Sequence, residues 1–457
     1  MNLKKVLLVF LLLLAMFLVA CSGDSGEEAG GTDTGEDSGN EETGSDDGGE
    51  EADSGEVVEL DFWTFWGSET RKPIIEKIIE DFNNSQDEIH VKHTHLPWGD
   101  IWTKNLAAVA AGDPPDVIIN DINSVKQRAV NNQVENITQY LDDGMESEYY
   151  PELWNAGVYE DEVYALPFNT DTRILYWNKD MFEEAGLDPD QPPTTWAEVE
   201  EYAQQLDEKN GDRFNTIGFL PNYGIGQDVW MMNATGHGFW DFEAGEPTLY
   251  NEKAVEALNW VRDYESRYGL NVIQGFEADF GNQQSNPFVA GKLGMAIHTP
   301  TGLYTQLRDY GQDVDFGVAP TPEMEEGNGH TTWGGGFVAE VPYGAKDPEA
   351  SVEFIKYLTG PEAQEYWAVM NFDNVANIAG AEAAAQSDEL TEKGQEVYQL
   401  AVDNMEHTIL TPFPVEAPDM MSLVDPELEK FRLGEQSAEE ALQNAQEAVK
   451  DLAESTE

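Results

Sequence analysis

The residues of this chain that could recognise a small molecule are its tryptophans and its many carboxylates. All 12 tryptophans lie after residue 60, and the sequence contains 89 Asp and Glu. A polyhydroxylated ring has apolar C–H faces that stack on aromatic rings and hydroxyl edges that pair with Asp, Glu, Asn or Gln. The composition therefore suits a carbohydrate or polyol, and the same carboxylates around aromatic rings would also suit a polyamine or another cation.

Catalytic motifs do not stand out in the sequence. It contains no G-x-S-x-G segment and no G-x-x-x-x-G-K-[ST] phosphate-binding loop. Among so many acidic residues, carboxylate pairs of the kind that hydrolyse glycosides occur by chance. We therefore predict no catalytic residue, no cofactor and no enzymatic activity, with a surface glycoside-active enzyme as the less favoured alternative.

Two clusters could in principle hold a metal ion. His90, His93 and His95 lie in one short segment, where His93 and His95 would share a strand face, and Tyr149 stands next to Tyr150. Neither cluster is accompanied by a pattern of further ligands, and the single cysteine excludes a Cys-based zinc site, an iron–sulfur cluster and a disulfide framework. The sequence therefore predicts no metal site.

The net charge of −65 limits the kinds of partner. A nucleic-acid backbone needs a basic face, so ordinary nucleic-acid binding is excluded. Outside a cell, such dense carboxylates would suit high external salt or high pH.

The first 21 residues predict where the protein resides. Lys4 and Lys5 precede an apolar run over residues 6–20, which is shorter than a membrane-spanning helix and typical of a secretory signal. The run ends in Leu-Val-Ala-Cys, which resembles the bacterial lipobox. We expect residues 1–20 to be a lipoprotein signal peptide and Cys21 to carry lipid that holds the protein on the outer face of the plasma membrane (the periplasmic side in a Gram-negative cell). A plain signal peptide or an uncleaved anchor, with Cys21 incidental, is the alternative.

Residues 21–56 are predicted to be a disordered tether. Between residues 22 and 56 the sequence has 14 acidic residues, 10 glycines and no basic residue. Such a segment cannot bury enough apolar surface to offset its chain entropy.

The rest of the chain alternates strand and helix patterns. The expected order begins with a strand at 57–65, a helix at 73–82, a strand at 89–95, a helix at 102–111 and a strand at 116–119. Thr195 with Glu198, and Ser437 with Glu440, form capping boxes that each open a later helix. This order predicts an α/β fold whose ligands lie near the carboxyl ends of its strands.

Short motifs in a fixed order resemble one protein family. They lie at residues 111–118 (AGDPPDVI), 166–168 (LPF), 175–182 (LYWNKDMF), 291–296 (GKLGMA), 333–336 (WGGG) and 350–354 (ASVEF). Together, over residues 57–455, they resemble bacterial extracellular solute-binding proteins of family 1, the maltose-binding type. The resemblance implies a sugar-binding lipoprotein that works as a monomer with the permease of an ABC importer and, through it, with the ATPase subunits.

The resemblance also implies the architecture. The fold would be the type II periplasmic-binding-protein-like fold, two α/β lobes joined by a hinge with the ligand cleft between them. Lobe 1 is expected at residues 57–168 and 293–345, and lobe 2 at residues 169–292 and 346–457. The first crossing between the lobes would lie at residues 169–173, and ligand contacts with both lobes would favour the closed state.

The family motifs finally suggest which residues line the cleft. The candidate ligand-binding residues are Trp66, Glu69, Asn120, Asp121, Asp171, Gln227, Trp230 and Trp333. For Asn120 and Asp121 the alternative is helix capping, and for Asp171 it is a hinge ion pair with Arg173. Packing roles are expected for Trp98, Trp102, Trp154, Trp196 and Trp367.

Overall fold

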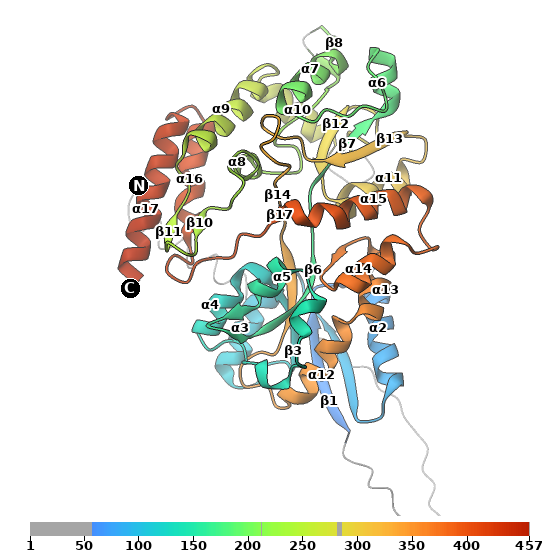
Figure 1. The fold of residues 1–457 in the computed structure, drawn as a ribbon, viewed down its shortest axis with the longest axis vertical. Coiled ribbons are helices and arrows are strands. Elements are labelled where there is room, and N and C mark those ends of the chain that lie inside the picture. Colours follow the sequence, from blue (N-terminus) through green and yellow to red (C-terminus); the bar gives the residue numbers. More distant parts are fainter. Residues whose placement is uncertain (1–56, 212, 281–285, 457) are drawn as a thin grey trace, which may run out of the picture. The chain divides into compact units, whose positions relative to one another are not determined.

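The computed structural model of the chain describes residues 57–211, 213–280 and 286–456 (Figure 1). The predicted signal peptide, Cys21 and the predicted acidic tether lie outside these residues. Within the described part of the chain, no helix is both long and apolar enough to cross a membrane.

The first of two main sheets has six strands. Their order is β16 (Asn374–Val375), β6 (Ala165–Thr170), β15 (Gly336–Glu340), β3 (Val117–Asp121), β1 (Val58–Thr64) and β2 (Ile89–His95). β1, β2 and β3 are parallel, and β15 runs antiparallel to both β3 and β6. The early strands expected from the sequence are therefore present, with polar residues at the carboxyl end of β3.

Helices cover this sheet through apolar faces spaced at the helical period. In α2 (Arg71–Ser85) the buried residues are Ile74, Ile75, Ile78, Ile79 and Phe82. These are the residues that predict a helix at 73–82, and that prediction is confirmed. α12 (Pro348–Leu358) contacts β1, β6 and α2, and α13 (Pro361–Asn371) also contacts α2.

The second main sheet is antiparallel and has three strands. β7 (Ile174–Asn178) lies between β12 (Met295–His298) and β13 (Phe316–Pro320). Its helices include α7 (Trp196–Leu206), which opens with the predicted capping box of Thr195 and Glu198. The second capping box is also present, since the Ser437 hydroxyl accepts from the Glu440 amide and Glu440 accepts from the Ser437 amide before α17 (Ala438–Thr456).

Strand pairing changes the lobe boundaries that the sequence predicts. β12 and β13 lie within residues 293–345, which are expected in lobe 1, yet both pair with β7 in the second sheet. Conversely, β16 lies within residues 346–457, expected in lobe 2, but pairs with β6 in the first sheet. The sequence-based boundaries are corrected for these elements, because long-range pairing, which no local pattern reveals, decides the sheet to which a strand belongs.

The chain passes between the two sheets where β6 ends and β7 begins. Between them, Thr172 shares a 2.6 Å hydrogen bond with Thr408, and Asn404 Nδ2 donates to Thr172 Oγ1 at 2.7 Å. A second link lies alongside, where β14 (Thr332–Trp333) pairs in parallel with β17 (Thr408–Ile409). Buried hydrogen bonds thus join the segments that connect the two sheets.

The other helices and strands of the described residues complete the fold around the two main sheets. The remaining α-helices are α3 (Ile101–Ala111), α4 (Val125–Val130), α5 (Pro151–Ala156), α6 (Lys179–Ala185), α8 (Gln227–Thr235), α9 (Glu252–Ser266), α10 (Leu270–Asp279), α11 (Thr305–Tyr310), α14 (Ile378–Ala385), α15 (Glu392–Asp403) and α16 (Met420–Arg432). The remaining strands are β4 (Val158–Tyr159), β5 (Glu162–Val163), β8 (Glu208–Asn210), β9 (Arg213–Thr216), β10 (Trp240–Asp241) and β11 (Glu246–Pro247).

Candidate ligand-binding cleft

Two adjoining cavities are lined by residues from both halves of the fold. The polar chamber, of about 480 Å³, is bounded by Asp121, Asn169, Asp171, Thr299, Gln306 and Asp373. The aromatic chamber, of about 570 Å³, is bounded by Glu152, Met232, Trp240, Thr411, Phe413 and Met420. Asn123 and Trp333 line both chambers, so the two cavities meet at these side chains.

The strands of the first sheet place the polar groups of the polar chamber. Phe337 on β15 is the register partner of Asp121 on one side and of Asn169 on the other. Both partners lie at or next to the carboxyl end of their own strand. The polar groups therefore gather at one edge of the sheet, as the alternating α/β pattern predicts.

Asp171 lies in the crossing segment, and its side chain is held by two neighbours. Its Oδ1 accepts from Arg173 Nη1 at 2.6 Å and from the Gly335 amide at 2.8 Å. The Arg173 guanidinium also lies 4.1 Å from the centre of the Trp333 ring. Asp171 thus forms the ion pair that the sequence gives as an alternative role, but its side chain remains 36% exposed and lines the polar chamber.

Asp121 combines a capping role with a place in the chamber wall. Its Oδ1 accepts from the Asn123 amide at 3.0 Å. Burial raises the pKa of Asp121, and the nearby Arg128 together with the hydrogen bonds to the carboxylate opposes that rise. A ligand that brings positive charge or hydrogen-bond donors to this carboxylate would stabilise its ionised form.

Aromatic side chains form one wall of the polar chamber. Trp98 is 53% exposed, and its ring packs edge-on against Phe65 at 4.6 Å and Phe337 at 5.5 Å between ring centres. Trp66 also lines the chamber but is only 2% exposed and packs against Trp367. Trp98, for which the sequence predicts a packing role, does pack against these rings but is also the more accessible stacking surface.

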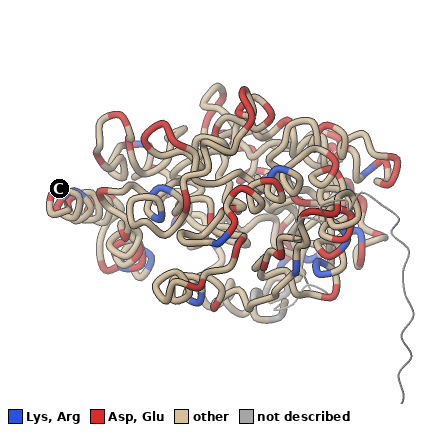
Figure 2. Tube along the Cα trace, turned by 90° about the horizontal axis from the view of Figure 1, so that it is seen from below, with Lys and Arg blue, Asp and Glu red and all other residues tan. Residues whose placement is uncertain are grey.

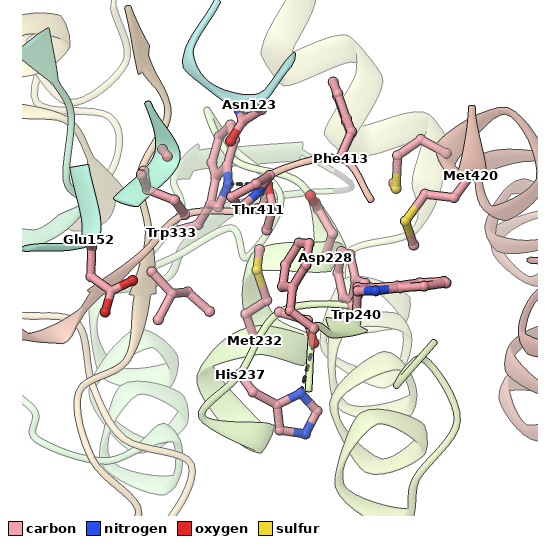
Figure 3. A pocket seen from close by; sticks show the side chains of 18 of the residues that line it. Asn123, Glu152, Asp228, Met232, His237, Trp240, Trp333, Thr411, Phe413 and Met420 are labelled. Atoms are coloured by element: carbon pink, nitrogen blue, oxygen red, sulfur yellow. Dashed lines mark hydrogen bonds between the residues drawn. The ribbon is translucent and has the colours of Figure 1, made fainter. Parts of the chain in front are cut away.

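The aromatic chamber is lined by sulfur-containing and aromatic side chains with a few polar groups. Figure 3 shows Met232, Trp240, Phe413 and Met420 around the cavity, with Asp228 among them. Trp333 Nε1 donates to Thr411 Oγ1 at 3.1 Å, which fixes the Trp333 ring at the junction of the chambers. Burial raises the pKa of the Asp228 carboxyl group.

The structure brings four of the predicted ligand-binding residues together and separates the other four from the chambers. Trp66, Asp121, Asp171 and Trp333 line the polar chamber. Glu69 is exposed and lines neither chamber. Gln227 lines two other cavities, beside α9 and α16.

Trp230 and Asn120 have structural partners instead of a place in the chamber wall. Trp230 is 0% exposed, and its Nε1 donates to the Pro221 carbonyl at 2.7 Å. Asn120 Nδ2 donates to the buried Glu340 at 2.6 Å, and Glu340 also pairs with Arg128. Both side chains are enclosed by the protein and line neither chamber, unlike the other predicted ligand-binding residues Trp66 and Trp333.

Several chamber residues are missing from the sequence-based prediction. Asn123, Asn169 and Gln306 line the polar chamber, and Asp228 and Trp240 line the aromatic one. Trp98 carried a usable signal, since it follows a strand and precedes Gly99, as Trp66 precedes Gly67. No pattern in the sequence marks Gln306, because only tertiary packing brings α11 to the edge of the first sheet.

A family model described as bacterial extracellular solute-binding protein matches residues 77–395, more than half of the chain. The chain belongs to this family. The multiple sugar-binding protein of Streptococcus mutans is 27% identical over 316 residues, covering 65% of this chain and 70% of that protein. The sn-glycerol-3-phosphate-binding periplasmic protein of Pectobacterium atrosepticum is 23% identical, covering 85% of this chain and 89% of that protein.

Solved structures of solute-binding proteins have the same fold. CpMnBP1 with mannotriose bound is 26% identical and has a TM-score of 0.72, covering 86% of this chain and all of that one. The cyclic α-maltosyl-1,6-maltose binding protein of Arthrobacter globiformis, at 22% identity, also has a TM-score of 0.72, covering 88% of this chain and all of that one. The prediction of a two-lobed α/β binding-protein fold is confirmed.

The described residues were predicted from the sequence to hold no metal ion. Among them, no group of three or more His, Cys, Asp or Glu side chains is arranged to hold a metal ion. In the cluster noted from the sequence, His93 instead shares a 2.7 Å hydrogen bond with Thr64 and lies near Glu76.

Proposed function

We propose that this solute-binding protein captures a carbohydrate outside the cell and delivers it to the permease of an ABC importer. The observation that carries the proposal is the polar chamber, where exposed Trp98 and the ring of Trp333 adjoin the carboxylates of Asp121 and Asp171. Aromatic faces beside hydroxyl-binding groups suit a sugar ring. The named relatives that bind sugars support the same class of ligand.

Hinge closure is the proposed mechanism of capture. Residues that follow β12, such as Thr299 and Gln306, face the same chamber as residues at the ends of β3 and β6. A ligand that contacts both sets stabilises the state in which the two halves are close, and the crossing segments beside Thr172 would absorb the motion. The ligand is released unchanged, so we propose no enzymatic step.

The proposed place of action is the cell surface. Cys21 would carry the lipid anchor, and residues 21–56 would let the monomeric binding unit reach the permease, which works with ATPase subunits. Replacing Cys21 by Ser should move the protein from the membrane fraction to the soluble fraction or the medium. Continued membrane association of Cys21→Ser would contradict lipid anchoring at this residue.

A thermal-shift screen tests the ligand class. The purified protein is heated with mono- and oligosaccharides, polyols, glycerol phosphate and polyamines, because a ligand that binds only the native state raises the melting temperature. We expect a rise with one sugar series, and chromatography should recover that sugar intact. A rise with polyamines alone would contradict the carbohydrate proposal, and cleavage of the sugar would contradict a purely binding role.

A further inference from the structure

The wall of the polar chamber contains several hydrogen-bond acceptors that have no donor among the described residues. Asn169 is only 5% exposed, and its Nδ2 donates to Asp373 Oδ2 at 3.0 Å. That bond fixes the orientation of the amide, because a carboxylate accepts and cannot donate when ionised. The atom left without a hydrogen-bond partner among the described residues is therefore the amide oxygen, Oδ1.

Gln306 repeats this arrangement on another part of the chamber wall. Gln306 Nε2 donates to the Gly302 carbonyl, so its unpartnered atom is also the oxygen. Asn123 is 7% exposed, lines both chambers, and its Oδ1 has no partner among the described residues. A buried acceptor without a donor is costly, so a ligand that supplies donors here gains affinity.

The carboxylates of the chamber extend this set of acceptors. Asp121 and Asp171 each accept hydrogen bonds through Oδ1, and neither Oδ2 has a hydrogen bond among the described residues. Asp373 is different, since donors from Asn169, Trp367, Asn371 and Thr301 surround its two oxygens. Two carboxylate oxygens therefore remain available to a ligand.

Positive charge in the chamber wall is scarce. Of the residues that line the polar chamber, Arg71 is the one cation, and its Nε donates to Asn371. The nearby Arg173 is bound to Asp171 Oδ1 and stacks on Trp333. An anionic ligand would meet Asp121 and Asp171 with little compensation, whereas an ammonium group would supply three donors and a positive charge.

Building on the carbohydrate function proposed above, we infer that the ligand is an amino sugar whose free, protonated amine binds between Asp121 and Asp171. Strands β3 and β6 flank β15, so Asp121 and Asn169 lie about 10 Å apart at their Cα atoms, given a strand spacing of about 4.8 Å. Phe337 on β15 is the register partner of both residues, and Asp171 follows Asn169 by two residues and lines the same cavity, so the two carboxylates border one space that is wide enough for a sugar ring. The neighbouring Trp98 and Trp333 add aromatic faces that favour a cation as well as a ring.

Isothermal titration calorimetry with four probes tests the inference. They are the glucosamine disaccharide with both amines free, its N-acetylated form, the neutral glucose disaccharide of the same linkage, and spermidine. At pH 6 we expect the disaccharide with free amines to bind at least tenfold more tightly than the N-acetylated and the glucose disaccharides. The advantage should shrink at pH 9, where the amine loses its proton.

Two variants locate the effect. Asp171→Asn and Asp121→Asn should each reduce the preference for the free amine over the neutral disaccharides at least threefold, a ratio that stays informative if affinity for the neutral disaccharides also falls. Both carboxylates are replaced, in separate variants, because Asp171→Asn also breaks the ion pair with Arg173. Melting temperatures show whether each variant folds. The matched control is Asp113→Asn, which removes an exposed carboxylate that lines neither chamber.

The outcomes separate this inference from the proposed function. Equal affinity for free-amine and neutral disaccharides overturns the amino-sugar inference but leaves a carbohydrate receptor. Spermidine binding as tightly as the amino disaccharide also overturns it, since the ring would then contribute nothing. Absence of binding by every disaccharide overturns the amino-sugar inference, whereas the carbohydrate function is contradicted only if the thermal-shift screen also finds no sugar that binds.

Discussion

Trp333 and Trp230 have different surroundings although the sequence predicts ligand contact for both. Trp333 lines both chambers, whereas Trp230 is enclosed among aromatic rings such as Trp196 and Trp260. Trp333→Ala should weaken binding of the sugar found in the screen by about 1–3 kcal/mol, the scale of one lost buried aromatic contact. Calorimetric titration measures this loss.

Trp230→Ala is the matched comparison. It should lower the free energy of unfolding by about 3–5 kcal/mol, because a large buried side chain is removed and leaves a cavity. Sugar affinity of the folded fraction should stay within about twofold of the original protein. If Trp333→Ala binds normally and Trp230→Ala abolishes binding without loss of stability, this assignment of the two residues is wrong.

His298 is expected to make stability depend on pH. Burial lowers the pKa of His298 to about 4, below the value near 6.5 of an unfolded chain. Between these values the unfolded state binds more protons, so the free energy of unfolding falls as pH drops from about 6.5 to 4, by at most about 1.4 kcal/mol per pH unit from this group. His298→Gln should remove that part of the dependence.

Urea titrations of both proteins at pH 7 and pH 5 measure the His298 contribution. Only the difference between the two proteins counts, because many carboxylates titrate over the same range. His298 packs close to Gly302, so the substitution can also weaken packing. The difference in stability between the two proteins at pH 7 measures that loss and is subtracted from the difference at pH 5. An identical pH dependence in both proteins would contradict a lowered pKa of His298 in the folded state.

Glycines at the first residue of β15 and just before it let this strand approach the crossing segment. A Cβ on Gly336 would lie 2.3 Å from the Asn169 carbonyl oxygen, and one on Gly334 would lie 2.4 Å from that of Asp171. Gly336→Ala should therefore push β15 away from β6, lowering both stability and ligand affinity. Thermal unfolding and titration with the same sugar measure the two effects.

Gly275→Ala provides the control for Gly336→Ala. Gly275 lies within α10, and a Cβ there would meet nothing within 4 Å. This substitution should raise stability by up to about 1 kcal/mol through helix propensity and leave affinity unchanged. Similar behaviour of the two alanine variants would show that the close approach of β15 and β6 is unimportant.

The elements themselves could be predicted where the pattern is local. The spacing of Ile74, Ile75, Ile78 and Ile79 identifies α2, and the Thr195–Glu198 capping box marks the start of α7. The sheet to which β12 belongs could not be predicted, because its partner β7 lies more than 100 residues earlier.

The same limit applies to the cleft. Asp121 and Asp171 could be found because strand ends and crossings are recognisable in the sequence. Trp230 lies in α8, a helix buried on nearly all sides, and nothing in its neighbouring residues shows that every face is covered. Which aromatic ring remains exposed is decided by packing between segments far apart in the chain.

The charge of the whole molecule leads to a prediction about salt. Figure 2 shows acidic residues spread over many loops and helices, with few basic residues between them, in keeping with a net charge of −65. Like charges repel more strongly in the compact state than in the expanded unfolded chain, so repulsion lowers stability. The screening length falls from about 10 Å at 0.1 M salt to about 3 Å at 1 M, which removes most of this repulsion between exposed groups.

The melting temperature should therefore rise by several degrees between 0.1 M and 1 M NaCl. Sulfate and other salts that strengthen apolar burial would raise it for a different reason, so NaCl is compared with an equal osmolality of a non-ionic, non-carbohydrate solute. Lowering the pH from 8 to 6 is a weaker test, because most carboxylates stay ionised over that range. A melting temperature that rises equally with salt and with the neutral solute would show that charge repulsion does not limit stability, and the acidic surface would then need another explanation, such as hydration.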